Sequence, residues 1–324
     1  MDDLEEFHIQ VTEDDSVKLR SVSYVMPVLN EEKYLRKAVE SILSQKFPGT
    51  IEIVLALGPS TDRTNEIARE LQREYLLTLV DNPTGTTSAG LNLAIAQASN
   101  EVIVRVDAHS KLSRGYTQLA VQVLNDTKAA NVGGLMHAVG ETPFQKAVAW
   151  GYMSRIGLGG GAFHVGAEAG PADSVYLGVF RKSALKAVGG FDEKVIRGQD
   201  WELNLRLREA GEVVWFDPRL EVEYHPRSSW RKLAKQFFET GIWRGTLTRR
   251  NPKAASLRYF APPVLVLSTL LVVPAVLYLL AILVAVLRAE RIAFLTRACL
   301  LLVLPTMHYA WGLGFIRGFL APRS

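Results

Sequence analysis

The segment that most constrains the fold is Glu101–His109, an apolar and β-branched run that stops abruptly at Asp107 and His109. A strand that is buried on both faces of a parallel sheet needs such a run, and ligands of open α/β sheets bind just beyond the carboxyl ends of the strands. A carboxylate and an imidazole two residues apart can hold Mn²⁺ or Mg²⁺ against a diphosphate. A strand end that is merely capped by polar side chains explains the same residues, and the spacing alone leaves both interpretations open.

Strands and helices alternate before this segment. The pattern predicts strands at 22–26, 51–57 and 76–80 and helices at 30–43, 65–73 and 89–98, with Asn30 as the N-cap of the first helix. Such alternation predicts a parallel sheet with right-handed crossovers. The loops that follow four strands then meet at one edge, at residues 27–31, 57–62, 82–88 and 107–109. Neither GxGxxG nor GxxxxGK[ST] occurs, so a standard dinucleotide or P-loop site is not expected.

Composition narrows the classes of partner. The 37 lysines and arginines against 33 acids give a formal charge of +4, which is too small to indicate nucleic acid, and no basic run is interleaved with aromatics. The single Cys299 excludes an internal disulfide and lies in an apolar stretch. The acidic N-terminus lacks the features of a secretory signal, so we expect it to stay on the cytoplasmic side. Residues 1–20 are expected to form an arm without a catalytic role.

The second half of the chain adds one more informative segment, Gln199–Gly211, for which the sequence predicts a helix with Asp200 at its front. A carboxylate there can cap the helix, and it can also act as a general base that takes a proton from an acceptor hydroxyl. Both interpretations can hold together. The glycine-dense segment 157–170 is long for a loop of a compact domain, and we predict that it forms a flap on the acceptor side.

Several of these motifs, taken in order, resemble family 2 glycosyltransferases of the GT-A fold, of the membrane-associated succinoglycan-biosynthesis type. They are VSYVMPVLNEEKYL at 22–35, STDRT at 60–64, Asp107-Ala-His109, and GGFDE followed by QDWELNLRLREAG at 189–211. The resemblance covers roughly residues 21–250. It implies an α/β fold with a mixed, mostly parallel sheet and helices on both faces. It also implies transfer of a sugar, with inversion of the anomeric centre, from a nucleotide-diphosphate sugar to a lipid-linked or saccharide acceptor.

The resemblance also assigns roles to individual residues. The residues implied in binding the nucleotide sugar are Pro27, Asn30, Glu31, Leu57, Asp62, Gly85, Asn92 and Asp107. Those implied in holding a divalent metal, Mn²⁺ or Mg²⁺, are Asp107, His109 and His225. Asp200 is the implied base, and the implied acceptor-side residues are Trp201, Glu202, Trp243 and Arg244. For Glu31, a structural role as an acid in the first turn of a helix is an equal alternative.

Two positions depart from the family pattern. Leu57-Gly58 stands where the family has a pair of aspartates, which puts recognition of the base and ribose in doubt. Asp107-Ala-His109 replaces the usual Asp-x-Asp and changes the second metal ligand.

The C-terminal region predicts a membrane attachment. Residues 229–256 alternate aromatic and basic side chains, as amphipathic helices at a membrane interface do. Two apolar stretches at about 264–287 and 296–316, within the region 257–324, are predicted membrane spans, with Pro274 accommodated as a kink. With 21–228 as the catalytic domain, we expect a multi-pass protein of the plasma membrane whose catalytic domain is cytoplasmic.

Two other functions fit the same sequence. In a polyprenyl-phosphate sugar transferase the lipid phosphate itself is the acceptor, and no strong base is needed. A catalytically silent membrane scaffold of the same fold is the second alternative, and Leu57-Gly58 is its best support. The sequence does not name the sugar, because the differences between pockets for related sugars are small.

Overall fold

The computed structural model describes residues 21–321 apart from 159 and 291, so the predicted arm at 1–20 lies outside the described residues. The strands are β1 (Ser21–Val28), β2 (Thr50–Leu57), β3 (Thr78–Asp81), β4 (Val102–Arg105), β5 (Ser110–Leu112), β6 (Asn131–Ala138), β7 (Gly170–Pro171), β8 (Tyr176–Arg181) and β9 (Val214–Tyr224). The helices of the catalytic region are α2 (Leu35–Leu43), α3 (Thr64–Glu74), α4 (Thr87–Gln97), α5 (Tyr116–Thr127), α6 (Pro143–Tyr152), α7 (Arg155–Leu158), α8 (Ala162–Val165), α9 (Lys182–Ala187) and α10 (Gln199–Glu209).

One mixed sheet organises these elements. Its strand order is β3-β2-β1-β4-β8-β6-β9-β5, and β7 pairs with β9. The pairings β2–β3, β1–β2, β1–β4 and β6–β9 are parallel, while β4–β8, β6–β8, β5–β9 and β7–β9 are antiparallel. The prediction of a mixed sheet is therefore correct. The first four strands are parallel, as predicted, whereas in the second half only β6–β9 is parallel and β8 runs antiparallel to β4 and β6.

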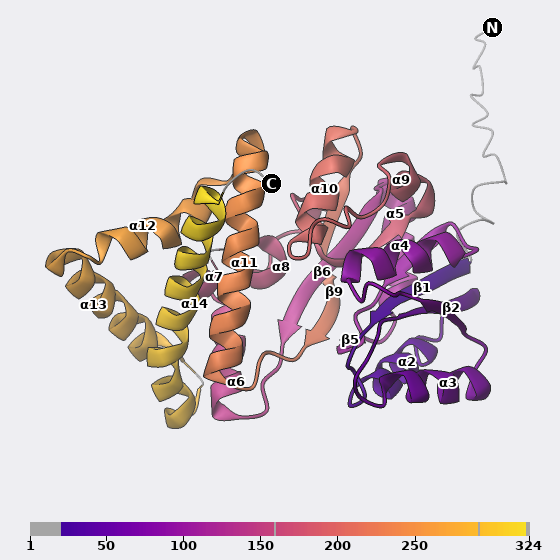
Figure 1. Cartoon of the computed structure of the whole chain (residues 1–324), viewed down its shortest axis with the longest axis horizontal. Coiled ribbons are helices and arrows are strands. Elements are labelled where there is room, and N and C mark those ends of the chain that lie inside the picture. Colours follow the sequence, from indigo (N-terminus) through magenta and orange to yellow (C-terminus); the bar gives the residue numbers. More distant parts are fainter. Residues whose placement is uncertain (1–20, 159, 291, 322–324) are drawn as a thin grey trace, which may run out of the picture.

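Helices cover both faces of the sheet (Figure 1). On one face α2, α3 and α5 contribute Leu35, Leu71 and Leu124 to a core with the inward side chains of β1, β2 and β4. On the other face α4, α9 and α10 pack over the same strands through a second core. The carboxyl ends of β1, β2, β3 and β4 consequently lie side by side, and the loops that follow them form one edge.

A third unit is made of the C-terminal helices α11 (Trp230–Arg250), α12 (Ala261–Ser268), α13 (Val272–Arg288) and α14 (Phe294–Leu320), with short 3-10 turns at Pro252–Ala254 and Leu257–Phe260. Glycines bring α11 and α14 into backbone contact, because a Cβ at Gly241 or Gly245 would overlap carbonyls of α14, and one at Gly314 or Gly318 would overlap carbonyls of α11. The other end of α14 packs on α6, where a Cβ at Gly151 would lie 2.8 Å from the sulfur of Met307.

The predicted first membrane span at 264–287 is wrong as a single helix. The chain breaks after Ser268 and restarts at Val272, with Leu271 extended, so that α12 and α13 form a wedge that projects from α14 on the side away from the sheet (Figure 1). Pro274 explains the restart, since a proline lacks the N–H that a continuous helix would need but is tolerated in a first turn. Among the described residues, α14 alone is long and apolar enough to cross a membrane, so two spans are not supported.

Candidate active site

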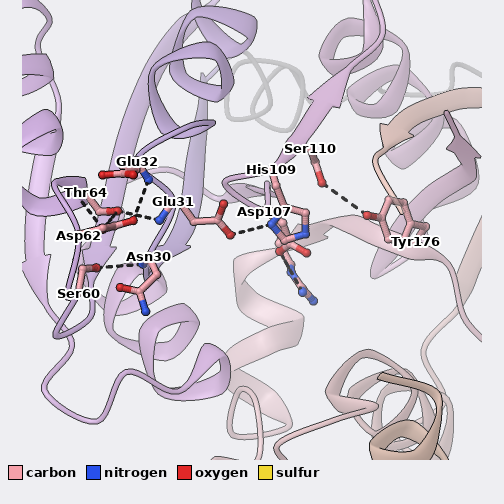
Figure 2. A network of polar contacts seen from close by, with 11 residues as sticks. Asn30, Glu31, Glu32, Ser60, Asp62, Thr64, Asp107, His109, Ser110 and Tyr176 are labelled. Carbon is pink, nitrogen blue, oxygen red and sulfur yellow. Dashed lines mark hydrogen bonds and ion pairs between the residues drawn. The ribbon is translucent and has the colours of Figure 1, made fainter. Parts of the chain in front are cut away.

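The loops after β1 and β2 are tied together by the residues that were predicted to bind the nucleotide (Figure 2). Asn30 adopts a left-handed backbone, with φ of 57°, so it is not the N-cap that the sequence predicted. Its side-chain oxygen accepts from the backbone N–H of Thr61 at 2.8 Å, and its own N–H donates to the hydroxyl of Ser60 at 3.0 Å. Asp62 accepts from the N–H of Thr64 at 3.0 Å and of Glu32 at 3.3 Å. Both side chains therefore shape the donor edge.

Other predicted donor residues lie along the same edge. Pro27 belongs to β1 and approaches α4, and Leu57 is buried at the end of β2. Gly85 has a left-handed φ of 65°, and a Cβ at Gly58 would lie 3.2 Å from the Cα of Gly85. The glycine that replaces an aspartate of the family pattern thus lets the loops after β2 and β3 approach closely.

Asn92 has a different environment from the one predicted. Its amide donates to the carbonyl of Phe191 at 2.9 Å and to Glu193 at 3.0 Å, and its oxygen accepts from the N–H of Phe191 at 2.8 Å. The ring of Phe191 in turn lies 5.8 Å from the guanidinium carbon of Arg105. These hydrogen bonds hold the segment after Gly190 against α4, and the role of Asn92 in binding the donor stays a prediction.

Glu31 reaches across the edge to His109 (Figure 2). Its Oε1 lies 2.9 Å from Nδ1 of His109, while its backbone N–H donates to the hydroxyl of Thr64 at 2.7 Å. Burial lowers the pKa of His109, but the hydrogen bond to Glu31 and the charges of Asp107 and Glu31 raise it by more, so the net pKa is raised. The contact fixes the ring and directs its Nε2 nitrogen away from Glu31.

Arg105 joins the two carboxylates that the sequence singled out. Its side chain is 3% exposed, its Nη2 lies 3.1 Å from Oδ1 of Asp107, and its Nη1 pairs with Oδ1 of Asp200. Arg105 is the last residue of β4, and Asp200 lies 95 positions later at the start of α10. Asp107 and Asp200, the predicted base, thus share the buried guanidinium of Arg105.

Asp200 lies in the first turn of α10. The helix begins after Gly198, whose φ of 79° makes the sharp turn possible, so Asp200 is not the N-cap itself but faces the positive end of the helix. Burial raises the pKa of the Asp200 carboxyl, the guanidinium of Arg105 lowers it and the charge of Asp107 raises it again, and the net pKa lies above the usual aspartate value. A carboxylate with a raised pKa beside a cleft is a chemically suitable general base.

The predicted metal ligands are not assembled as a set of three. Among the described residues no group of three or more His, Cys, Asp and Glu side chains is arranged to hold a metal, and Nε2 of His225 lies 3.2 Å from Glu223. Asp107 and His109 nevertheless fit a divalent ion in their chemistry. Mg²⁺ is usually bound by one or two carboxylates together with substrate phosphates, and a ligating histidine commonly donates its other ring N–H to a carboxylate, as His109 can to Glu31.

The predicted acceptor-side residues divide into two groups. Both carboxylate oxygens of Glu202 accept hydrogen bonds from Arg206 one turn later, at 2.6 and 2.7 Å, so this carboxylate forms its ion pair within α10. Trp201 of α10 is buried against α11, where it packs in one cluster with Leu247 and the partly buried Trp243. The guanidinium carbon of Arg244 lies over two rings, 4.8 Å from the centre of Trp201 and 4.5 Å from the centre of Tyr259.

Arg105 was not among the residues predicted for the site, although its signal is present in the sequence. An arginine within a run of valines and isoleucines that is buried on both sides is costly, and such a charge persists only with partners. The partner Asp107 could have been inferred from its spacing. Asp200 could not, because no local pattern links β4 to α10.

Comparison with known proteins identifies the family. Residues 23–189 match the model described as glycosyl transferase family 2. Succinoglycan biosynthesis protein ExoA of Rhizobium meliloti (strain 1021) is 34% identical over 251 residues, which are 76% of this chain and 76% of that protein. The dolichyl N-acetyl-alpha-D-glucosaminyl phosphate 3-beta-D-2,3-diacetamido-2,3-dideoxy-beta-D-glucuronosyltransferase of Methanococcus voltae is 25% identical over 317 residues, 94% of this chain and 98% of that protein.

A solved structure supports the fold. The mannosyltransferase PcManGT from Pyrobaculum calidifontis, in complex with GDP-Man and Mn²⁺, has a TM-score of 0.64 at 18% identity and covers 92% of this chain and 87% of that one. The likeness confirms a GT-A-like α/β fold with a mixed central sheet. The family match and the motifs agree with it, and the chain therefore belongs to glycosyl transferase family 2 and is a glycosyltransferase.

Proposed function

We propose that this glycosyltransferase moves a sugar, with inversion, from a nucleotide-diphosphate sugar to a lipid-linked or cell-envelope saccharide acceptor at a membrane surface, and that it depends on Mn²⁺ or Mg²⁺. The observation that carries the proposal is the bridge from Asp107 through Arg105 to Asp200. It joins a donor-side carboxylate to a carboxylate suited to activate an acceptor, as a displacement at one carbon atom requires.

The donor occupies the edge formed by the loops after β1, β2, β3 and β4. Pro27, Asn30, Glu31, Leu57, Asp62, Gly85 and Asp107 line or shape it in this proposal. Asp107 and Nε2 of His109 would hold the metal, with His225 as the third ligand that the resemblance implies. When bound, the ion neutralises charge on the diphosphate leaving group. PcManGT holds GDP-Man and Mn²⁺ in its solved structure, which supports a nucleotide sugar and a metal in this chain.

Asp200 acts as the base. Its carboxylate takes the proton of the acceptor hydroxyl while the hydroxyl oxygen forms a bond to the anomeric carbon. The bond from that carbon to the diphosphate oxygen breaks, and the nucleoside diphosphate leaves with the electron pair. Arg105 keeps Asp200 oriented and favours its charged form, so it is a positioning residue.

Membrane attachment in this proposal uses one face of the protein. Residues 261–287 contain no charged side chain, and the turn between α12 and α13 exposes Leu270 by 82% and Val272 by 79%. Helix α13 has 17 residues, about 26 Å at 1.5 Å per residue, which is short of the ~30 Å hydrocarbon core. The wedge of α12 and α13 therefore enters the lipid without crossing it.

Helix α14 is unsuited to a separate crossing. It packs on α6 through Val303, Leu304 and Met307 and then runs beside α11, from the hydrogen bond between Trp230 and Thr306 onward. Because α11 carries cations along its length, a bilayer around α14 would have to take charged side chains with it, which is costly. We propose that none of the described helices crosses the membrane and that the catalytic domain lies on the cytoplasmic side, where nucleotide sugars are found.

The Asp200→Asn variant tests the chemistry. Asparagine keeps the shape and can still accept a hydrogen bond, so donor affinity and melting temperature should stay near the native values. Removing a general base typically costs about 10²–10⁴-fold in rate, and we expect that loss in transfer to a hydroxyl acceptor at saturating donor. Asp126→Asn, on α5, serves as the matched control. Poor donor binding with normal turnover at saturation would move Asp200 to the donor site and contradict the proposed role.

A further inference from the structure

A cavity of about 630 Å³ lies between the catalytic domain and the C-terminal helices. Trp201 of α10 borders it, next in sequence to Asp200. The segment 155–174 and helix α11 form its polar side, and α12, α13 and α14 form the opposite side. None of the residues predicted to bind the donor lines the cavity, so it is separate from the predicted donor site.

The polar side of the cavity carries an excess of positive charge. Arg155, Arg244 and Arg258 line it, and the acidic lining residue Asp173 lies 3.6 Å from Arg208 outside it. Within the described residues, the buried Nη1 of Arg244 has no hydrogen-bond partner. Burial lowers the pKa of Arg244, and the charge of Arg258 lowers it further.

Aromatic rings stabilise this cation but leave it unsatisfied. The guanidinium carbon of Arg244 lies over the rings of Trp201 and Tyr259, at 4.8 and 4.5 Å, yet a ring face supplies no oxygen to accept its N–H groups. A guanidinium binds phosphate through two parallel hydrogen bonds and is the side chain best matched to that geometry. Arg244 is thus built to receive an anion from a ligand.

Helices α12, α13 and α14 line the cavity mainly with apolar side chains. His308 of α14 also lines it, and both of its ring nitrogens have partners, the hydroxyl of Tyr278 and the carbonyl of Ile156. Leu265 of α12, with Met307 and Trp311 of α14, lines the cavity, and Pro262 and Tyr278 continue this surface on α12 and α13. The same two helices form the exposed apolar wedge, so the lining is continuous with the surface that faces lipid in the proposed function. A ligand that fits both sides has an anionic head and a long hydrocarbon chain, and it can enter from a membrane.

We propose that this cavity binds the phosphate and the first prenyl units of the lipid that carries the acceptor. This inference rests on the proposed function, because it names the acceptor of that reaction as a prenyl phosphate or diphosphate ester. Arg244 and Arg258 hold the phosphate, Leu265 and its neighbours hold the chain, and the head group is directed along Trp201 toward Asp200. His164, whose pKa burial and the charge of Arg258 lower to about 3, lines the cavity as a neutral imidazole.

Binding of small prenyl probes tests the proposal without any activity. We would titrate the purified full-length chain in detergent with farnesyl phosphate, farnesol and inorganic phosphate, and follow heat or tryptophan fluorescence. Binding of farnesyl phosphate should saturate, and the affinities for farnesol and for inorganic phosphate should be at least about tenfold lower. Dihexanoyl phosphatidic acid distinguishes a prenyl site from a general site for anionic lipids. Equal affinity for this phospholipid and for farnesyl phosphate would overturn the assignment to the acceptor.

Variants locate the binding in this cavity. Arg244→Ala should lower the affinity for farnesyl phosphate at least about tenfold. Arg244→Lys should lower it by less, because lysine keeps the charge but lacks the two parallel N–H donors of a guanidinium. Leu265→Trp fills the apolar side and should lower the affinity for farnesyl phosphate without removing a charge. This variant keeps the test possible if Arg244→Ala does not fold. Arg231→Ala, an exposed cation of the same helix outside the cavity, should leave affinity unchanged. Equal affinities of the wild type and all four variants for farnesyl phosphate would refute the proposal.

Donor binding is measured on the same samples. A chain that binds nucleotide sugar and transfers it to a soluble saccharide, but does not bind farnesyl phosphate, would disprove the cavity assignment alone. A chain that binds farnesyl phosphate through Arg244 but no nucleotide sugar would disprove the proposed function and leave the prenyl phosphate site standing.

Discussion

Replacing Arg105 by leucine removes the cation shared by Asp107 and Asp200 while keeping most of the side-chain volume. In the proposed mechanism Asp200 is active when deprotonated, so activity should be lost as the pH falls through the pKa of Asp200, which already lies above that of an ordinary aspartate. Arg105 lowers this pKa. Its removal must therefore raise the pKa of Asp200 and move the acid limb of the rate profile to higher pH.

The size of the shift follows from the geometry. At about 4 Å and an effective dielectric constant of about 20, two unit charges interact by about 4 kcal/mol, and about 1.4 kcal/mol corresponds to one pKa unit. The side chain of Asp200 is 29% exposed, so solvent screens roughly half of this interaction. We expect a rise of about 1–2 pKa units, within the range of about 1–3 typical of an aspartate beside an arginine.

The assay is the dependence of kcat on pH at saturating donor, acceptor and Mn²⁺. Arg105→Leu should reach a plateau within about tenfold of the wild type at high pH, with its acid limb shifted upward. Arg105→Lys keeps the charge and should shift the limb by less. Arg36→Leu, which removes an exposed cation paired with Glu74 at 2.7 Å, serves as the control. A folded Arg105→Leu enzyme with normal donor binding and an unmoved acid limb would refute the reasoning.

The remaining predictions concern the metal, the membrane and the helix contact. Asp107→Asn keeps an oxygen for Arg105, and we expect it to abolish the Mn²⁺-dependent part of the thermal shift given by a nucleotide sugar; an undiminished Mn²⁺ effect would argue against Asp107 as a ligand. Exchanging Leu270 and Leu271 together for glutamate should lower binding to vesicles by about 100-fold or more in a flotation assay, because burying each leucine is worth about 1.5–3 kcal/mol, whereas Leu76→Glu, on an exposed loop of the catalytic domain, should have no effect. Gly314→Leu should lower the melting temperature by several degrees, since overpacking costs about 1–3 kcal/mol or more, and an unchanged value would contradict the close packing of α11 on α14.

The sequence predicted the donor half of the fold because its signals are local there. Each strand from β1 to β4 is an apolar run closed by a turn, and a parallel sheet brings the ends of such runs to one edge. The positions of Asp107 and of the loops around Asn30 and Asp62 followed from that rule. Pairings between distant segments were not predictable, such as the antiparallel return of β8 beside β4 or the contact of Arg105 with Asp200, because they depend on tertiary packing and not on any local period.

The structure breaks the predicted span at 264–287 into two helices, whereas α14, which contains the predicted span at 296–316, is long and apolar enough to cross a membrane. Hydropathy measures how apolar a segment is but not what covers it, and the same composition suits a membrane span and a helix packed on protein. In α14 the glycines at 314 and 318 recur four residues apart, as they do at 241 and 245 in α11. That spacing predicts a close contact between two helices, and it was the signal in the sequence that α14 has a protein partner along its second half.

The packing of α14 ties the membrane region to the catalytic domain. Its buried side chains lie in one core with those of α6 and α11. Tyr152, the last residue of α6, packs against Phe237 of α11 and against Tyr224, the last residue of β9. The ring of Tyr224 lies 6.3 Å from that of His109. A truncation that removes α14 would leave apolar faces of α6 and α11 open to water and would disturb the aromatic side chains next to His109. The C-terminal helices and the candidate active site are therefore parts of one folded unit, and an enzyme that lacks the proposed membrane contact is better sought by changing the exposed wedge of α12 and α13 than by removing the C-terminal helices.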